Sequence, residues 1–519
     1  MNRHLTTLLA LQFALAATVS AQHEHASHPA PEVLGAVIFP TTCEKSVQPA
    51  FERALALLHS FAYTDAEAGF RDVATADPKC AIAHWGVAMS LFHQLWDNPG
   101  PQDLAKGAAE LAQARTLDTG SPRERAFIAA AAVYFTDDGK SPHAVRAKAY
   151  EQAMAEVATR FPDDAEAQIF HALALIAIAP PTDRTHADQK RAADILEPLY
   201  HRYPQHPGLA HYLIHAYDSA ELAPRGLAAA RAYAKIAPSA PHALHMPSHV
   251  FTRLGDWNDS IASNKAARAA AHAAGDVGEE LHAMDYLTYA YLQLGRDADA
   301  KRVVDDAASL HGLAAGKFKI GYAANAMPTR YAIERRQWKD ATTLQPLPDS
   351  EPHVAAIVYW ARAVGASRSA HPDDADADIA RIDACIAKLD AAGNTYWATL
   401  TRVLADSARA WQFHARGNDD EAIALLRKAA DSEDASEKLP VTPGPIVPAR
   451  EQLGDLLLET GHPADALREF RTALKDAPGR RGALNGAAQA SRSSGQAKAA
   501  KTIRPCGDCG APGIGADAR

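Results

Sequence analysis

The feature that most constrains the fold of this chain is a 34-residue spacing between two pairs of histidines. His211 and His215 form one pair, and His245 and His249 repeat it 34 residues later. Within each pair the residues are four apart, so both imidazoles lie on one face of an α-helix. A fixed period of about 20–50 residues is typical of repeat arrays, in which equivalent helices of successive units stack side by side. The spacing therefore predicts a stack of helix pairs with one histidine-bearing face.

Glycine, alanine and proline mark the same register in other parts of the chain. Gly461 and Gly495 are 34 residues apart, and Pro478 lies where the second helix of a unit should end. Small residues let two helices approach closely, and proline cannot continue a helix. The run VLGAVIFP (33–40) alone has the pattern of a β-strand. We therefore expect helices over most of residues 46–500, arranged as antiparallel pairs.

The repeated register resembles that of tetratricopeptide-repeat proteins. The last clear unit has the consensus residues of that family at Leu453, Gly454, Leu457, Gly461, Ala466, Phe470, Ala473 and Pro478. More narrowly, blocks such as APHALHMPSHVFTRLGDW and PAREQLGDLLLETG are similar to a widespread group of exported bacterial repeat proteins. The resemblance covers residues 35–495 and implies an all-α fold, a tetratricopeptide-like superhelix (α-solenoid) of antiparallel helix pairs. Since that group has no established activity, the resemblance implies a fold and a compartment but no reaction.

The first residues have the pattern of a secretory signal peptide. Arg3 precedes an uncharged apolar run, and Val19-Ser20-Ala21 is a small-residue cleavage site. We therefore assign residues 1–21 as the signal peptide and expect an exported chain, periplasmic or secreted. The apolar run is shorter than the roughly 20 residues that a membrane span needs, and no later stretch qualifies. We expect no membrane span in the mature chain.

Composition and repeat register divide the rest of the chain. The segments are a disordered His-rich leader with a short irregular segment (22–45), an N-terminal and central array with a histidine-lined groove (46–345), a C-terminal array (346–500) and a flexible tail that contains CGDC (501–519). The histidines of the leader are either loose metal donors or part of a solvated segment.

Export makes the cysteines informative. Cys43 and Cys80 lie on either side of the first predicted helix pair, and an oxidising compartment permits a bridge between them. We expect their Cα atoms to lie about 4.4–6.8 Å apart, with two independent buried thiols as the alternative. Cys385 falls in a helical pattern and should lie in the core. Cys506 and Cys509 of the tail fit a short disulfide, a redox dithiol or half of a metal site.

Three segments place polar side chains on the helix faces that line the concave groove of a tetratricopeptide array. These residues are His211, His215 and Asp218; His242, His245 and His249; and His282, Asp285 and Tyr289. Imidazole is the commonest transition-metal ligand near neutral pH, and zinc or copper needs three or four donors at about 2 Å. We therefore predict a zinc or copper site whose ligands are His211, His215, His245, His249, His282 and Asp285.

The remaining groove-facing residues are predicted to bind a ligand directly. They are Asp218, His242 and Tyr289 together with Trp85 and Met89 of an N-terminal repeat. Two alternatives stand beside the metal site. The groove can hold a peptide or small ligand without any metal, or the imidazoles can simply pack and hydrogen-bond. For Trp85, filling the core of the array is the alternative to contacting a ligand.

Taken together, these patterns favour a binding protein over an enzyme. We expect an exported scaffold that holds a peptide, protein partner or small ligand in its groove, either through a bound metal or with no cofactor. HYLIH (211–215) lacks the glutamate of the HExxH zinc-protease motif, and no carboxylate is placed as a general base, so we assign no catalytic residue. A metal-dependent hydrolase or oxidoreductase is the first alternative, and a periplasmic metal-handling protein is the second. The net charge of −9 is mild and the charges are interspersed, which argues against nucleic acid as a partner.

Overall fold

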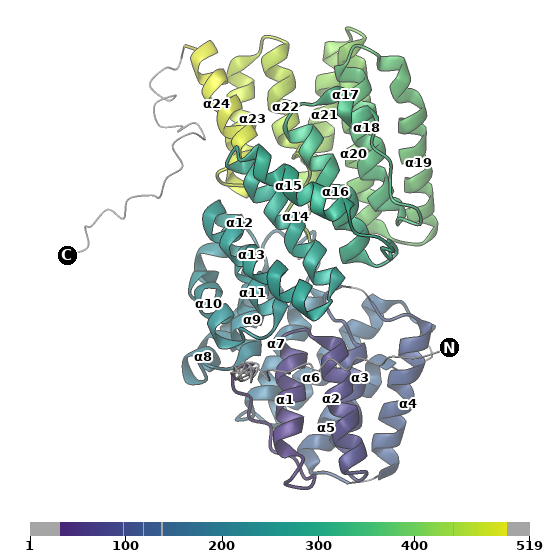
Figure 1. Ribbon diagram of the computed structural model, residues 1–519, viewed down its shortest axis with the longest axis vertical. Coiled ribbons are helices and arrows are strands. Elements are labelled where there is room, and N and C mark those ends of the chain that lie inside the picture. The colour runs from purple at the N-terminus through teal and green to yellow at the C-terminus, as the bar shows by residue number, and fades with distance from the viewer. Residues whose placement is uncertain (1–31, 97, 118, 136–138, 440, 496–519) are drawn as a thin grey trace, which may run out of the picture. The chain divides into compact units, whose positions relative to one another are not determined.

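The computed structural model describes residues 32–495 except 97, 118, 136–138 and 440 (Figure 1). The predicted signal peptide, the leader histidines and the CGDC tail lie outside the described residues. All of the described helices belong to one compact unit that begins at Val33.

The described chain is helical from Gln48 to Ser493 (Figure 1). The first helices are α1 Gln48–His59, α2 Tyr63–Ala76, α3 Ala81–Leu91, α4 Pro101–Leu117, α5 Pro122–Phe135, α6 His143–Arg160, α7 Ala165–Ile178 and α8 Ala187–Arg202. The central helices are α9 Pro207–Ala216, α10 Ala223–Ile236, α11 Pro241–His245, α12 Pro247–Leu254, α13 Trp257–Ala274, α14 Val277–Gln293, α15 Asp297–Ala308, α16 Phe318–Glu334 and α17 Trp338–Thr342. The last are α18 Pro352–Arg368, the 3₁₀ helix η2 Pro372–Ala375, α19 Asp376–Ala391, α20 Thr395–Ala415, α21 Asp419–Asp434, α22 Ala449–Glu459, α23 Pro463–Asp476 and α24 Arg481–Ser493.

Each helix packs mainly against helices one or two places away in the sequence, as a stack of antiparallel helix pairs requires. Contacts run from α1 to α2, from α2 to α3 and onward to α23 and α24. The predicted all-α, tetratricopeptide-like arrangement is therefore confirmed. The prediction of a β-strand at 33–40 is wrong, because this run has no regular secondary structure. It lies across the helices instead, with the Ala36 N–H donating to the Gln205 carbonyl at 2.9 Å and Phe39 fully buried.

Glycines at equivalent places let a phenylalanine of the neighbouring helix pack against the backbone. A methyl group added to Gly86 on α3 would lie 2.3 Å from the ring of Phe70 on α2. Phe470 on α23 is held in the same way from both sides, since a Cβ on Gly454 or on Gly486 would lie 2.7 or 2.2 Å from its ring. These contacts explain physically why the repeat register places small residues there.

Replacing Gly86 with alanine should destabilise the fold by about 1–3 kcal/mol, because the new methyl group overpacks the contact with Phe70. Urea unfolding followed by circular dichroism measures the change. Gly278 on α14 provides the control, since a Cβ there meets only the side chain of Asp276 at 3.4 Å. Gly278→Ala should be neutral or slightly stabilising, because alanine favours the helix. Equal effects of the two substitutions would contradict the packing explanation.

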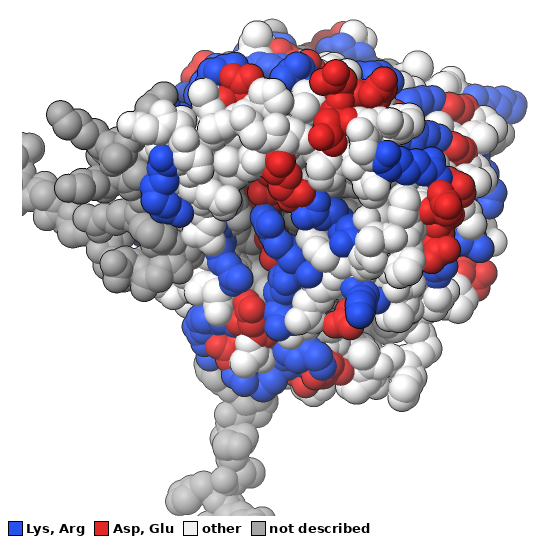
Figure 2. Space-filling model, turned by 90° about the horizontal axis from the view of Figure 1, so that it is seen from above, with Lys and Arg blue, Asp and Glu red and all other residues white. Residues whose placement is uncertain are grey.

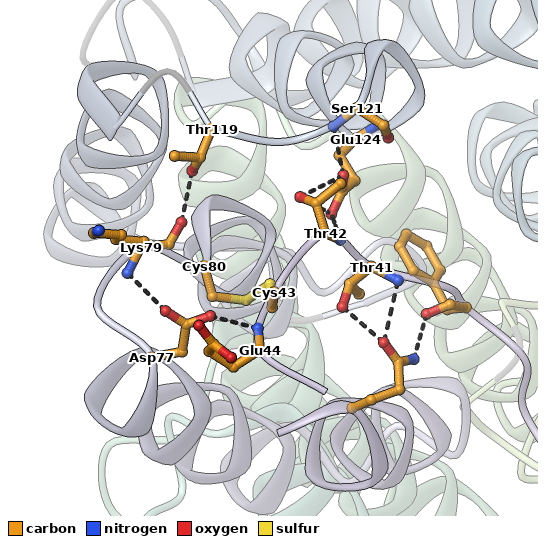
Figure 3. The surroundings of a disulfide bond; sticks show 12 residues. Thr41, Thr42, Cys43, Glu44, Asp77, Lys79, Cys80, Thr119, Ser121 and Glu124 are labelled. Carbon is orange, nitrogen blue, oxygen red and sulfur yellow. Dashed lines mark hydrogen bonds between the residues drawn. A yellow bond between two sulfur atoms is a disulfide. The ribbon is translucent and has the colours of Figure 1, made fainter. Parts of the chain in front are cut away.

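Cys43 and Cys80 form a disulfide with their Cα atoms 4.8 Å apart, which confirms the predicted pairing (Figure 3). The bridge ties the segment before α1 to the start of α3. Beside it, both oxygens of the Asp77 carboxylate accept backbone N–H groups, from Glu44 at 2.8 Å and from Lys79 at 3.1 Å. A structural disulfide is typical of an oxidising compartment. Cys385 is buried as a free thiol, as predicted.

Two further features bear on the environment of the chain. None of the described helices is long and apolar enough to cross a membrane. Lysine and arginine side chains alternate with aspartate and glutamate over the face shown in Figure 2, in agreement with the interspersed charges of the sequence.

Candidate metal centre

The six histidines that were predicted to face a groove gather in two neighbouring groups. The first group is His211, His215 and His242, and the second is His245, His249 and His282. Within each group the candidate ligand nitrogens all lie within 4.8 Å of one another. Every one of these side chains is buried, with residue exposures between 0% and 5%. The sequence predicted one shared cavity open to a groove, whereas the structure has two groups enclosed in the interior.

The helices place two members of each group one turn apart. On α9, the Nε2 atoms of His211 and His215 lie 3.1 Å apart. His245 and His249 have the same spacing although a proline interrupts their helix: α11 ends at His245 and α12 begins at Pro247, which has no N–H to donate. Their Nε2 atoms lie 3.0 Å apart.

The third member of each group comes from another helix. His242, at the start of α11, has its ring 5.0 Å from that of His211, and His282 on α14 has its ring 4.2 Å from that of His245. The two groups also adjoin each other, because the rings of His215 and His249 are 6.0 Å apart. His242 was predicted as a ligand-binding residue, and the structure instead places it among the imidazoles.

Oxygen acceptors fix the tautomers of His249 and His245 in the second group. The Nδ1 atom of His249 lies 2.9 Å from the carboxylate of Asp218, so this nitrogen carries the proton. The Nδ1 atom of His245 lies 2.6 Å from Oδ1 of Asn264, whose amide donates to the Ser260 carbonyl at 2.8 Å. The bond from Asn264 to Ser260 orients the amide so that Oδ1 faces His245, and the His245 Nδ1 therefore donates to this oxygen. The two Nε2 atoms that face each other at 3.0 Å are therefore both lone-pair nitrogens.

Two members of the first group have the same kind of support, whereas the Nδ1 atom of His215 has no hydrogen-bond partner. The Nδ1 atom of His211 donates to the backbone carbonyl of His59 at 2.7 Å. The Nδ1 atom of His242 lies 3.2 Å from the carboxylate of Glu279, which also binds Lys319. The Nε2 atom of His242 has no hydrogen-bond partner. Metal-ligating histidines almost always donate their second ring N–H to a carboxylate or carbonyl in this way.

Burial keeps His211, His215, His245, His249 and His282 neutral. It lowers the pKa of His211, His215, His245 and His282 well below the ordinary value, and neighbouring imidazoles lower it further. Burial likewise lowers the pKa of His249 to about 4, against the opposing effect of Asp218. Neutral imidazole is the form that binds a metal ion.

Asp218 supports the second group through a hydrogen bond to His249. Its carboxylate is fully engaged and is not open to bind a ligand, although the sequence predicted it to be a ligand-binding residue. Besides His249 it accepts from Arg253 Nε at 2.9 Å and from Lys438 Nζ at 2.9 Å. Burial alone raises the pKa of Asp218, but Lys438 and Arg253 outweigh it and hold the pKa well below its usual range. The carboxylate is therefore an acceptor only.

Asp285 is the one predicted metal ligand that the structure places in neither group. Although three residues from His282, it turns toward α16, where its carboxylate lies 3.8 Å from Arg330 Nε. Burial raises its pKa to about 6 despite this neighbour. The attraction of the arginine explains why helical spacing alone misplaced this residue.

The other predicted binding residues lie away from the histidines. Trp85 and Met89 are buried in the hydrophobic core, and Trp85 packs against Phe39, so the structure corrects their expected exposure to a groove. Tyr289 borders a cavity, and its hydroxyl lies 3.3 Å from Arg480.

A third buried cluster joins His59, Glu166 and His206, which the sequence analysis did not connect. Both ring nitrogens of His59 are engaged, with Tyr212 at 2.9 Å and with Glu166 at 2.9 Å. His206 binds the other oxygen of Glu166 at 2.8 Å. Burial raises the pKa of Glu166, but the two imidazoles outweigh it and hold the pKa well below its usual range. The only signal in the sequence was His206 itself, five residues before His211.

No protein-family model matches this sequence. The comparison with curated proteins found no match either. Among solved structures, the human IFIT1 dimer with m7Gppp-AAAA is 10% identical over 82% of this chain and 88% of that one, with a TM-score of 0.35. The TPR domain of P58(IPK) is 12% identical over 87% of this chain and 99% of that one, with a TM-score of 0.23. Similarities this weak carry no conclusion about function.

Proposed function

We propose that this chain is an exported transition-metal-binding protein built on a tetratricopeptide-like scaffold. One observation carries the proposal: the Nε2 lone pairs of His245 and His249 face each other at 3.0 Å in a buried site. Two lone pairs repel at this distance unless a cation lies between them. Burial disfavours a proton on either ring, so a metal ion is the cation that the geometry suits best.

The spacing of the nitrogens fits such an ion. Two nitrogens bound to one tetrahedral ion at about 2.0–2.1 Å lie about 3.3 Å apart, close to the 3.0 and 3.1 Å of the two histidine pairs. Three imidazoles without a thiolate or carboxylate suit zinc or copper, and they leave a fourth position open. We infer one ion for each group, and hence two for each chain.

Burial of the histidines also bears on the alternatives. A peptide lying on the array cannot touch side chains that are at most 5% exposed. We therefore treat metal binding and the binding of a partner on the outer faces of the scaffold as two separate functions. The disulfide supports an oxidising, extracytoplasmic location. The proposal assigns no reaction to the metal.

Metal content after dialysis against zinc or copper tests the proposal. The untagged protein should retain two equivalents by elemental analysis. His215→Ala and His249→Ala should each remove one equivalent, and the double variant should retain none while its helical circular dichroism stays unchanged. The exposed His272, which pairs with Glu280, gives the matched control, since His272→Ala should keep both ions. Metal retained by the double variant would refute the site assignment.

A further inference from the structure

The cavity that Tyr289 borders lies among the helices that follow the histidine groups. It has a volume of about 180 Å³ and is bordered by α18, α20, α21 and the segment between α21 and α22. Its walls are rich in aromatic rings, including Tyr322, Trp360, Tyr396 and Trp397. The partly exposed side chains of Arg184 and Asp476 also border it, and they mark its outer end.

One polar side chain on this wall has no partner within the protein. His353 is 7% exposed, and neither of its ring nitrogens makes a hydrogen bond. Its ring stacks on Trp397, with the centroids 4.2 Å apart and the planes at 20°. Burial lowers its pKa to about 4, so at neutral pH the ring is a neutral group with one donor and one acceptor. A buried polar group without a partner is costly, and this one borders an open volume.

Several of the other polar groups around the cavity are already engaged. Trp360 Nε1 donates to Ser407 at 3.1 Å, and the Tyr396 hydroxyl accepts from the Leu439 N–H at 3.1 Å. The charged groups are paired as well, since Arg253 and Lys438 both bind Asp218. Both ring nitrogens of buried His353 are therefore left to recognise a ligand, and the paired charges favour a neutral one.

We propose that this cavity binds a small planar aromatic molecule with one hydroxyl group, of the phenol class, through a hydrogen bond to His353. The size agrees, because an apolar cavity of about 150 Å³ takes up benzene. The aromatic walls supply stacking and edge contacts for a ring. The site is independent of the metal proposal, although Lys438 and Arg253 connect its wall to Asp218 and so to His249.

Calorimetric titration of the metal-free protein with phenol and toluene tests this site. The two probes have nearly the same shape and differ in the hydroxyl group. The unaltered protein should bind both. His353→Leu should weaken phenol at least about tenfold, because the hydroxyl loses its partner, and should leave toluene within about threefold. Failure of phenol to bind the unaltered protein, or equal weakening of both probes, would overturn the proposal.

A second variant guards against a folding defect in His353→Leu. Leu400 borders the cavity, and Leu400→Trp should fill the volume and abolish binding of both probes while His353 remains in place. Anisole, which has no hydroxyl hydrogen, and phenol can also be compared on the unaltered protein with no substitution. Phenol binding that survives in Leu400→Trp would place it elsewhere and reject this cavity.

Discussion

Saturating the metal-free protein with zinc should raise its free energy of unfolding by about 8 kcal/mol when the free ion exceeds the dissociation constant 1,000-fold. Each site contributes about 4 kcal/mol under that condition, because the ion binds the folded chain and not the unfolded one. The folded chain already holds three imidazoles of each group together, whereas in the unfolded chain the members of one group are up to 37 residues apart in sequence, from His245 to His282. Urea unfolding at a fixed, buffered concentration of free zinc measures the difference.

The variants of the histidine groups provide the controls for this effect. His249→Ala should show about half of the stabilisation, and the double variant His215→Ala with His249→Ala should show none. His272→Ala should respond as the unaltered chain does. If zinc left the unfolding curve of the unaltered protein in place, the two groups would be neutral hydrogen-bonded clusters and not metal sites.

The histidine-bearing helix faces could be predicted from the sequence, because helical spacing and the repeat period are local properties. His211 and His215 needed only their separation of four residues to be placed together. The fold followed for the same reason, since the contact of Gly86 with Phe70 belongs to one pair of consecutive helices.

The division into two groups could not be predicted, because it depends on residues far away in the sequence. The carboxylate of Glu279 holds His242 from 37 residues away, and Arg330 draws Asp285 away from the histidines. The amide of Asn264, which fixes the tautomer of His245, carried no sequence signal at all. A pattern of spacings contains none of these pairings.

Arg480 is a further residue whose importance no sequence pattern indicated, since it lies in the turn before α24. It is fully buried, and it binds the Glu451 carboxylate at 2.7 and 3.1 Å and the Glu334 carboxylate at 2.9 Å. Burial lowers the pKa of the guanidinium, but the two carboxylates outweigh this and raise it well above the usual value. Through these bonds α24 is tied to α16 and α22.

Replacing Arg480 with alanine should therefore destabilise the fold by about 3–5 kcal/mol, because two buried carboxylates would lose their cation. Urea unfolding of the variant measures the loss. Arg402 gives the matched control: it binds Asp390 at 2.5 Å, but both side chains are half exposed, so Arg402→Ala should cost no more than about 1 kcal/mol. Combining Arg480→Met with Glu334→Gln and Glu451→Gln should recover part of the stability, since it removes the stranded charges together with the arginine. If the triple variant were less stable than Arg480→Ala, the loss would come from the packing of the side chain and not from uncompensated charge.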